Sequence, residues 1–250
     1  MVSAVDDRPV CLLTGASGTL GEAFCRGYAE QFRIVGVHRS RVLSVDNQDS
    51  WTVDPLAASG PLAETDRLGR GVFAIRADLA EPEAVDRVVE LALARFGRID
   101  SVVNAAGMAL WGPVLTSPHV VDRAAEQFAV NTLVPLRLVQ AVVQRFWRDR
   151  AGENRASNRC VVNVSSAAGL WVYQGRGQSV YSASKSALNT LSMHLADELR
   201  PIGIRVNVLA PDSFPDPVPV LAVIEALSEL ISGDATGQIV LVDQAGAQPV

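Results

Sequence analysis

A tyrosine and a lysine four positions apart carry the clearest chemistry in this sequence. Tyr181 and Lys185 occur in the segment YSASK, inside a stretch with helical periodicity, and residues four apart lie on the same face of a helix. A phenol is a poor acid at neutral pH because its ordinary pKa is about 10, and a neighbouring ammonium group lowers that pKa. The pair is therefore suited to give a proton to a carbonyl oxygen, or to take one from an alcohol, while a hydride moves.

Lys185 also stands out by composition. It is the only lysine in a chain of 250 residues, in which Lys and Arg together number 22. Arginine rarely gives up its proton or acts as a compact point charge, whereas lysine does both. We therefore favour a chemical role for Lys185 over the chance retention of one lysine. Upstream, Ser165 and Ser166 end the apolar segment CVVNVSS, where a hydroxyl would hydrogen-bond a substrate oxygen.

A glycine-rich turn near the start of the chain has the composition of a phosphate-binding loop. Residues 14–21 read TGASGTLG and lie between an apolar run at 10–14 and a helical pattern at 21–31. The free N–H groups at a helix N-terminus attract phosphate, and glycines let the backbone approach it closely. This order of strand, turn and helix favours a dinucleotide site over a purely structural connection, with Gly15, Gly18 and Gly21 as the turn glycines.

Two arginines after the next apolar run indicate which dinucleotide binds. Arg39 and Arg41 flank Ser40, and no acidic residue follows until Asp46. Sites for NAD usually carry an acid there for the ribose 2′-hydroxyl, whereas arginine accommodates the 2′-phosphate of NADP. We expect NADP(H) rather than NAD(H); the alternative is a pair of solvated surface arginines.

Short apolar runs alternate with helical patterns along the whole chain. This alternation predicts one α/β domain over residues 1–250, a Rossmann-like, doubly wound parallel sheet with helices on both faces. Two stretches lack periodicity: 39–70, an irregular insertion between the second and third strands with a short helix at 62–68 as one alternative, and 211–219. The expected strands are 10–14, 34–37, 71–75, 99–103, 160–164, 204–209 and 238–242, and the expected helices are 21–31, 81–96, 121–148 (bent near Pro135), 179–199 and 220–231.

The composition argues against several classes of protein. A net charge of −5 with 20% charged residues does not favour nucleic-acid binding. No apolar run reaches the length of a membrane span, and the N-terminus has no signal-peptide pattern. Cys11, Cys25 and Cys160 lack metal-ligand spacing, so we expect no metal site and read them as buried thiols. These features predict a cytoplasmic enzyme.

Taken together, the motifs resemble the short-chain dehydrogenase/reductase family over nearly the whole chain. The matching segments are TGASGTLG, Asp78-Leu79, NAAG at 104–107, Asn131, NVSS at 163–166, YSASK and RVNVLAP at 205–211. The resemblance implies nicotinamide chemistry with a catalytic set of Asn131, Ser166, Tyr181 and Lys185. Tyr181 would be the general acid/base, Lys185 would lower its pKa and hold the nicotinamide ribose, Ser166 would orient the substrate oxygen, and Asn131 would hold a water in a proton relay.

The resemblance also implies the residues around the ligands. Asp78 would contact the adenine, and Asn104 and Gly107 would line the cofactor site. The full expected cofactor set is Gly15, Ser17, Gly18, Thr19, Leu20, Gly21, Arg39, Ser40, Arg41, Asp78, Leu79, Asn104, Ala105, Ala106, Gly107, Tyr181, Lys185 and Pro211. The expected substrate set is Met108, Trp111, Trp171, Tyr173 and Arg176, with Leu110 beside it; core packing is the alternative for the aromatic members.

The chain departs from the family at positions that bear on the substrate. The glycine spacing is TGxxGxxG where classical members have TGxxxGxG, and Pro211-Asp212 stands where the family has Pro-Gly. Asp212 would add bulk and negative charge near the nicotinamide end of the pocket. The segment after it, with the shortened substrate loop 211–219, resembles a family member that has lost most of its lid, which predicts an open pocket for a bulky or carrier-tethered substrate.

Three functions follow from these observations. The first is an NADP(H)-dependent ketone reductase or alcohol dehydrogenase. The second is a cofactor-binding protein with little turnover, a sensor or an assembly subunit, which Asp212 and the short lid favour. The third, an epimerase or dehydratase, rests on the glycine spacing alone. The helices at 121–148 and 179–199 resemble the family's dimerisation pair, which implies a homodimer or homotetramer.

Overall fold

One mainly parallel sheet organises the protein. The computed structural model describes residues 6–43, 45, 48–53 and 72–250. Within these residues nine strands form a sheet in the order β3-β4-β2-β1-β5-β6-β7-β8-β9, and every neighbouring pair is parallel except β8 and β9. The strands are β1 (Val10–Thr14), β2 (Arg33–His38), β3 (Gln48–Val53), β4 (Val72–Arg76), β5 (Ser101–Asn104), β6 (Cys160–Val164), β7 (Arg205–Pro211), β8 (Ile239–Asp243) and β9 (Gly246–Pro249).

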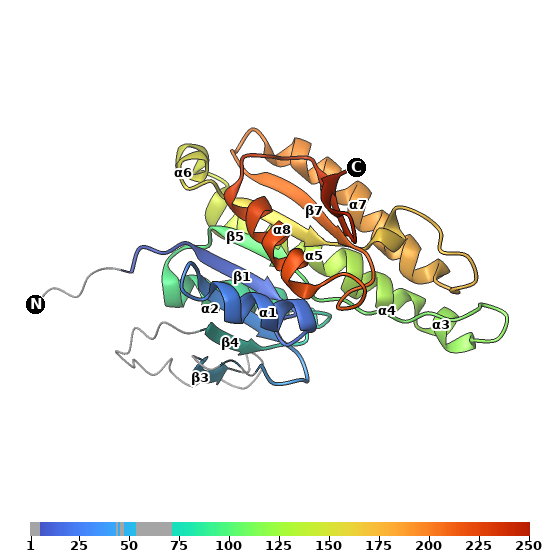
Figure 1. The fold of residues 1–250 in the computed structure, drawn as a ribbon. Coiled ribbons are helices and arrows are strands. Elements are labelled where there is room, and N and C mark those ends of the chain that lie inside the picture. The colour runs from blue at the N-terminus through green and yellow to red at the C-terminus, as the bar shows by residue number, and fades with distance from the viewer. Residues whose placement is uncertain (1–5, 44, 46–47, 54–71) are drawn as a thin grey trace, which may run out of the picture.

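Helices connect the parallel strands and cover both faces of the sheet (Figure 1). The α-helices are α1 (Thr19–Tyr28), α2 (Ala84–Phe96), α3 (Pro118–Asp122), α4 (Ala124–Phe128), α5 (Val134–Val142), α6 (Ala151–Ala156), α7 (Ser179–Leu199) and α8 (Val220–Ser232). Two π-helical turns, η1 (Ala129–Leu133) and η2 (Val143–Trp147), flank α5, and η3 (Ala167–Gly169) is a short 3₁₀ turn after β6.

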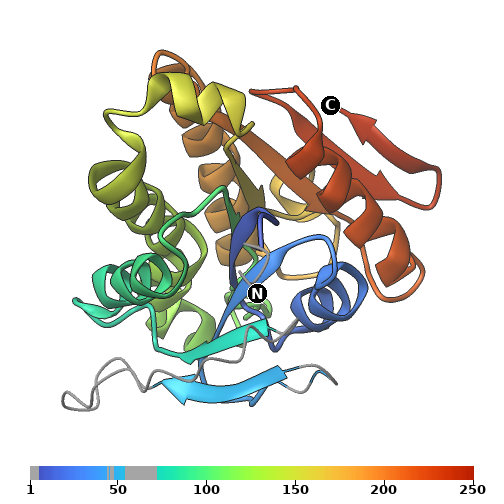
Figure 2. The same cartoon turned by 90° about the vertical axis from the view of Figure 1, so that its left-hand side faces the viewer.

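The central strands are buried on both faces, so their alternate side chains enter two separate cores. Leu12 of β1 packs with α2, α5 and α7 on one face, while Leu13 packs with α1 and α8 on the other. This is why the strands are continuously apolar instead of alternating. Viewed along the sheet, the helices lie in a layer on each side, with β3 at one edge and the β8–β9 hairpin at the other (Figure 2). The fold is therefore the doubly wound α/β sandwich that the sequence predicts.

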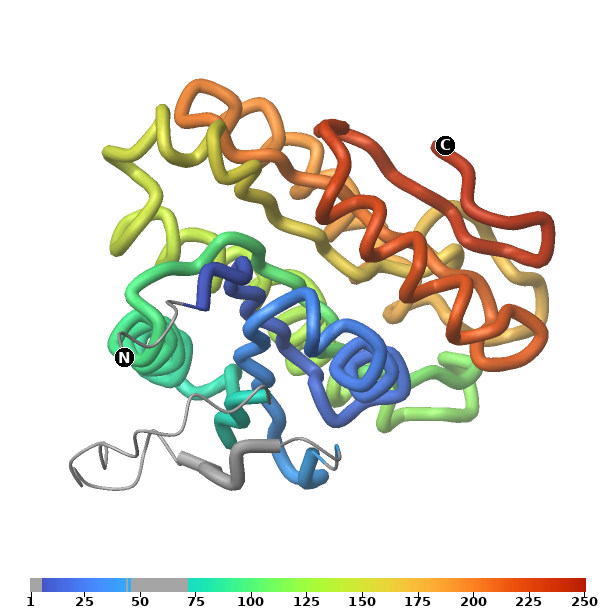
Figure 3. Tube along the Cα trace, turned by 60° about the vertical axis from the view of Figure 1, so that its left-hand side comes forward, coloured from blue at the N-terminus to red at the C-terminus, as the bar shows by residue number. Residues whose placement is uncertain are grey.

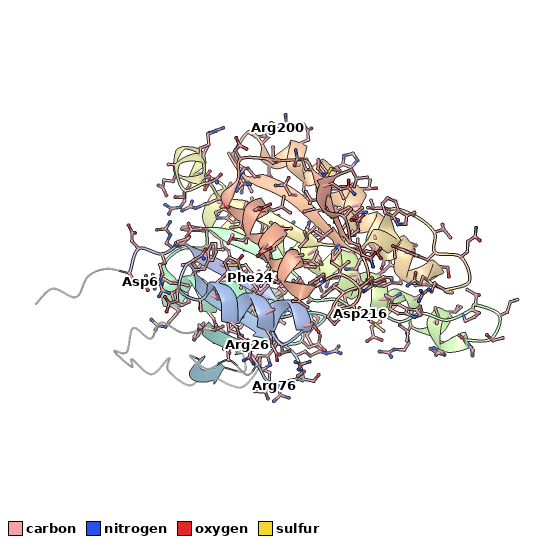
Figure 4. The ribbon with its side chains drawn as sticks, in the orientation of Figure 1. Asp6, Phe24, Arg26, Arg76, Arg200 and Asp216 are labelled. Carbon is pink, nitrogen blue, oxygen red and sulfur yellow. The ribbon has the colours of Figure 1, made fainter. Side chains whose placement is uncertain are left out.

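Three aromatic rings, from α1 and the segment after it, pack in the core under the layer of α1 and α8. The two helices run side by side in Figure 3, one in blue and one in red. Phe24 of α1, labelled in Figure 4, is fully buried in this core. Its ring stacks on Tyr28 with centroids 5.0 Å apart and lies 5.8 Å from the ring of Phe32. Burial of this group fixes α1, and with it the turn that precedes the helix.

The order of the strands places a crevice at the carboxyl end of β1. From β1 the chain moves outward through β2 and β4, then returns to add β5 on the other side of β1. Connections from neighbouring strands thus diverge at this point, where ligands bind in open α/β sheets. The loop before α3 and the segment at 170–178 extend beyond the same edge of the sheet (Figure 1).

The structure differs from the predicted elements in four places. Strand β3 lies inside the stretch 39–70 that was expected to be irregular, whereas the alternative helix at 62–68 falls outside the described residues. The expected helix 121–148 is divided by η1 and η2. The turn η1 precedes Pro135, which has no N–H to donate to the carbonyl of Asn131 four residues earlier, so the α-helical pattern is interrupted there. Helix α6 and strand β9 were not predicted.

The described residues also bear on the expectations for membrane-spanning helices and for the three cysteines. Within these ranges no helix combines the length and apolarity needed to cross a membrane. The three cysteines are buried and free. Burial raises the pKa of the Cys160 thiol to about 11, so this thiol stays protonated and unreactive at neutral pH.

Candidate active site

Lys185 reaches the floor of a cavity from the buried face of α7. The residue is only 4% exposed, and its Nζ atom donates a hydrogen bond to the carbonyl oxygen of Val164 at 2.9 Å. Burial lowers the pKa of this ammonium group to about 8. The Nζ atom lies 6.0 Å from the ring centroid of Tyr181, so the four-residue spacing does bring the two side chains to one face.

Tyr181 is enclosed between Trp111 and the end of β6. Its ring meets that of Trp111 edge to face, with centroids 5.3 Å apart. Burial raises the pKa of the Tyr181 phenol, and a hydrogen bond with Ser166 opposes that rise. The sequence predicted that this pKa would be lowered. A spacing of four residues shows that an ammonium group is near the phenol, but it does not show that the phenol is buried away from water. The phenol is therefore held in its protonated form.

The two serines after β6 have different partners. Ser166 caps η3 by accepting a hydrogen bond from the N–H of Ala168 at 3.1 Å, and it also contacts Tyr181. Ser165 is buried, and its hydroxyl donates to the carbonyl oxygen of Lys185 at 3.3 Å. Both line the cavity, but Ser166 is the one paired with the phenol.

Asn131 joins three segments of the site from the turn η1. Its Oδ1 accepts from the N–H of Met108 at 2.7 Å, and its Nδ2 donates to the carbonyl oxygen of Met108 and to the hydroxyl of Ser184, each at 2.9 Å. Asn131 is 1% exposed. These hydrogen bonds fix the loop after β5 against α7.

The glycine turn leaves the N-terminus of α1 free to bind an anion. Gly18 is the N-cap, and no side chain caps the helix, which leaves the first N–H groups of α1 without intrahelical partners. A Cβ on Gly21 would lie 2.3 Å from the carbonyl oxygen of Gly15. A Cβ on Gly15 would lie 2.7 Å from the backbone of Ala105, at a φ of +70°. Glycine is therefore required where the turn packs against α1 and β5.

Two cavities meet at the carboxyl end of β5. The first, about 370 Å³, runs from the glycine turn to the end of β2, and the second, about 360 Å³, contains Tyr181 and Lys185. Both are lined by Ala105, Gly107 and Met108, so they form one continuous cleft. A Cβ on Gly107 would meet Asn131 Oδ1 at 3.6 Å and Lys185 Nζ at 3.7 Å; the missing side chain leaves this junction open.

The first cavity fits an extended dinucleotide. Of the expected cofactor residues it is lined by Gly15, Ser17, Gly18, Arg39, Ser40, Arg41, Asp78, Leu79, Ala105, Ala106 and Gly107, and the second cavity adds Tyr181, Lys185 and Pro211. The expected residues Thr19, Leu20 and Gly21 belong to the first turn of α1, and they line neither of the two cavities. Asn104 is 1% exposed and its Nδ2 donates to Asn163 at 2.8 Å. This places its amide in the core instead of the cofactor cleft.

Cationic side chains gather at the far end of the first cavity. Arg39 lies 3.7 Å from Asp78, and Arg41 lies 2.8 Å from Glu22; both guanidinium groups are mostly exposed. Arg123, between α3 and α4, lines the same cavity and was not predicted, since it lies outside any recognisable motif. Exposed ion pairs of this kind exchange partners at little cost, so these arginines can turn to a bound phosphate.

The second cavity has the expected substrate residues and others besides. Met108, Trp111, Tyr173 and Arg176 line it. Trp171 does not, but its Nε1 donates to the Tyr173 hydroxyl at 3.3 Å. Several lining residues were not predicted, among them Gln178 and Phe214; neither of these two lies in a motif.

A main-chain contact holds the outer wall of the second cavity. The N–H of Gly112 donates to the carbonyl oxygen of Gly177 at 2.9 Å. A Cβ on Gly177 would lie 2.5 Å from the backbone of Gly112, at a φ of +63°. This contact joins the loop that carries Trp111 to the segment that carries Tyr173.

Comparisons with known proteins agree with this architecture. A family model described as short chain dehydrogenase matches residues 9–215. Human 3-hydroxyacyl-CoA dehydrogenase type-2 is 30% identical over 217 residues, which make up 84% of this chain and 74% of that protein. A short-chain dehydrogenase/reductase from Brucella ovis, in complex with a partially ordered NAD, is 25% identical with a TM-score of 0.69, covering 95% of this chain and 100% of that chain.

The fold is also shared with more distant proteins. The crystal structure of a short chain dehydrogenase from Mycobacterium avium has a TM-score of 0.75 at 21% identity, covering 98% of this chain and 85% of that chain. Members of the matched family bind a nicotinamide cofactor and act on alcohols and carbonyl compounds. On the family match, the human relative and the shared fold, this chain belongs to the short-chain dehydrogenase family of oxidoreductases.

Proposed function

We propose that this protein is an NADP(H)-dependent oxidoreductase that interconverts a ketone and an alcohol. The observation that carries the proposal is the continuous cleft, which joins a cationic end at Arg39 and Arg41 to the buried pair Tyr181 and Lys185. A bound nicotinamide would supply the hydride. The protein then has to hold the substrate oxygen, provide a proton and exclude water.

Tyr181 is proposed to supply the proton. Its phenol is hydrogen-bonded to Ser166, and both groups face the cavity where a carbonyl oxygen would be held. During reduction the phenol gives its proton to the oxygen, and burial, which raises its pKa, keeps that proton available at neutral pH. Ser166 orients the same oxygen through its hydroxyl.

Lys185 is proposed to stabilise the phenolate left behind and to bind the nicotinamide ribose. An ammonium near the phenolate offsets the charge that develops as the proton leaves. Asn131 is proposed to take part in the proton relay implied by the family. Its side chain also bonds to Met108 and Ser184, so Asn131 holds the loop at Met108 in place as well.

The choice of NADP(H) is proposed from the charges at the end of β2. Arg39, Arg41 and Arg123 line this end of the cleft with the Ser40 hydroxyl. Guanidinium groups bind phosphate through paired, charge-assisted hydrogen bonds. Asp78, which pairs with Arg39 at 3.7 Å, adds one negative charge beside these three positive charges. The net positive charge at this end of the cleft favours a ribose 2′-phosphate over a 2′-hydroxyl.

The substrate is proposed to be bulky or carrier-tethered. The human relative is named for a 3-hydroxyacyl-CoA, a thioester of a large carrier. Trp111 and Trp171 are 46% and 44% exposed at the outer end of the cavity region, where they would contact an acyl or aryl group. Arg176 lines the same cavity and would pair with an anionic portion of the carrier.

The experiment that tests this function is a paired titration with NADPH and NADH followed by fluorescence. We expect binding of NADPH that is at least tenfold tighter than that of NADH, since one lost guanidinium–phosphate pair costs about 1.5–3 kcal/mol. A panel of ketones, hydroxyacyl thioesters and sugars then identifies the substrate class. Tyr181→Phe should abolish turnover and retain cofactor affinity; turnover unchanged in that variant would refute the proposed chemistry.

A cofactor-binding protein with little turnover is the second candidate. The observation in its favour is the 2.7 Å hydrogen bond from the Tyr173 hydroxyl to Asp212, which joins two residues that line the substrate cavity. NADPH binding without turnover of any substrate, in the wild type and in Tyr173→Phe alike, would support this candidate over the enzyme.

A homodimer or homotetramer is also proposed. Val121 and Leu133, on the helical run from α3 to η1, are 53% and 43% exposed. Apolar side chains at these positions fit an interface between copies of the chain. Light scattering coupled to size-exclusion chromatography measures the mass directly, and a monomer at micromolar concentration would count against the assembly.

A further inference from the structure

Asp212 lies directly after β7, in the same cavity as Tyr181 and Lys185. Its backbone N–H donates to the carbonyl oxygen of Val242 at 2.9 Å. Its Oδ1 accepts from the Tyr173 hydroxyl and from the N–H of Ser213, both at 2.7 Å. These contacts hold the carboxyl group of Asp212 in place at the wall of the cavity.

The nicotinamide ring has to enter this cavity if the proposed function is correct. The substrate oxygen is held by Tyr181 and Ser166, and the hydride must reach the carbon bonded to that oxygen. The cleft leads from the cationic end to this cavity through Gly107 and Met108. A cavity of about 360 Å³ is roughly 9 Å across if treated as a sphere, so Asp212 is within Coulombic reach of a ring placed there.

The charge of a nicotinamide ring depends on its redox state. In carbonyl reduction the substrate carbon gains a hydride, its oxygen gains the proton of Tyr181, and the ring, having lost the hydride, becomes a cation. The reverse reaction removes that positive charge. A fixed anion near the ring therefore stabilises the oxidised form more than the reduced form.

We propose that Asp212 biases this site toward carbonyl reduction by stabilising the oxidised, positively charged nicotinamide. The proposal rests on the proposed function. Among the described residues, two other charged side chains line the cavity, Lys185 and Arg176. Lys185, which donates to Val164, acts against the oxidised ring in the wild type and in variants of Asp212 alike, so a comparison of these proteins isolates the contribution of Asp212. Arg176 is exposed and screened by water. Asp212 is held by Tyr173 and Ser213 and cannot turn away freely.

The expected size of the effect follows from Coulomb's law. A unit charge about 7 Å from the ring, at an effective dielectric constant of about 20–40, alters the relative affinity for the two redox forms by on the order of tenfold. For a two-electron couple, a tenfold change corresponds to about 30 mV in the potential of the bound cofactor.

The measurement is the ratio of the dissociation constants of NADP⁺ and NADPH, by calorimetry and fluorescence, in the full-length protein. Asp212→Asn keeps an acceptor for the Tyr173 hydroxyl and removes the charge. We expect it to weaken NADP⁺ relative to NADPH by about tenfold. Asp212→Gly provides a second neutral variant in case the asparagine disturbs folding, and it should shift the ratio in the same direction.

Two controls separate charge from position. Tyr173→Phe removes the hydrogen bond but leaves the carboxylate, so its ratio should stay within about twofold of the wild type. Asp234→Asn removes an exposed carboxylate outside the cavity and should likewise change little. An unaltered ratio in both Asp212 variants would overturn the inference, as would an equal shift in Tyr173→Phe. Absence of binding of either cofactor by the wild type would instead refute the proposed function.

Discussion

Replacing Lys185 with methionine should make the protein more stable and inactive. Burial lowers the pKa of Lys185 from 10.5 to about 8, and at about 1.4 kcal/mol per pH unit this difference costs the folded state roughly 3 kcal/mol at neutral pH. Methionine keeps the unbranched stem but loses the 2.9 Å bond to Val164, worth about 1 kcal/mol. The net expected gain in the free energy of unfolding is about 2 kcal/mol.

The gain should depend on pH in a defined direction. Because the folded pKa of Lys185 is below the unfolded one, the unfolded chain binds more protons between pH 8 and 10.5, and wild-type stability rises across that window. The free-energy cost of burying the Lys185 ammonium is therefore complete below about pH 8 and absent above about pH 10.5. The advantage of Lys185→Met should therefore be constant from pH 6 to about 8 and should shrink as the pH rises further.

Urea unfolding of the cofactor-free protein at several values of pH from 6 to 10 measures this difference. Ser186→Ala is a matched control on the same helix, because it removes a 2.8 Å bond to Gly169 without altering a charge, and its effect should be independent of pH. If Lys185→Met is less stable than the wild type at pH 7, or if its advantage does not change with pH, the burial of a lysine ammonium at this site is refuted.

Three further substitutions test the cleft. Asn131→Ala should lower the free energy of unfolding by about 2–4 kcal/mol in urea, because it leaves buried partners at Met108 and Ser184 unpaired; a loss under about 0.5 kcal/mol would contradict the bonding described. Gly21→Ala should abolish cofactor binding, since its Cβ would meet Gly15 at 2.3 Å, whereas Gly152→Ala meets no atom within 4 Å and should bind normally. Arg39→Gln should weaken NADPH about tenfold by titration and leave NADH within twofold; equal losses for both would rule out 2′-phosphate recognition.

Periodicity was sufficient to predict the central part of the fold. Strands such as β1 and β6 are buried on both faces, so each shows as an unbroken apolar run. Strand β3 (QDSWTV) lies at an edge of the sheet and has mostly polar residues, and β9 (GAQP) is four residues long. Neither sequence has the unbroken apolar run that identifies a core strand. These two segments are recognised as strands by their pairing with β4 and β8 and not by their own residues.

The site was predictable where its residues share one element and less so where they converge from several. Tyr181 and Lys185 share a helix, so spacing alone brings them together. Gln178, Phe214 and Arg123 reach the cleft through loops whose paths the sequence does not encode locally. The pKa of Tyr181 was predicted in the wrong direction for the same reason, since burial comes from distant segments.

Several features that work against stability lie around the cleft. An ammonium group is buried at Lys185, a helix is interrupted at η1, and glycines at 107 and 177 leave room or allow close backbone contact. In the apolar central strands, by contrast, local preference and packing agree. Conflicts between local preference and fold are expected at functional sites. In the function that we propose, the protonated phenol of Tyr181 and the side chain of Asp212 both favour carbonyl reduction, so the measured ratio of NADP⁺ to NADPH affinity tests the proposed direction as well as the role of Asp212.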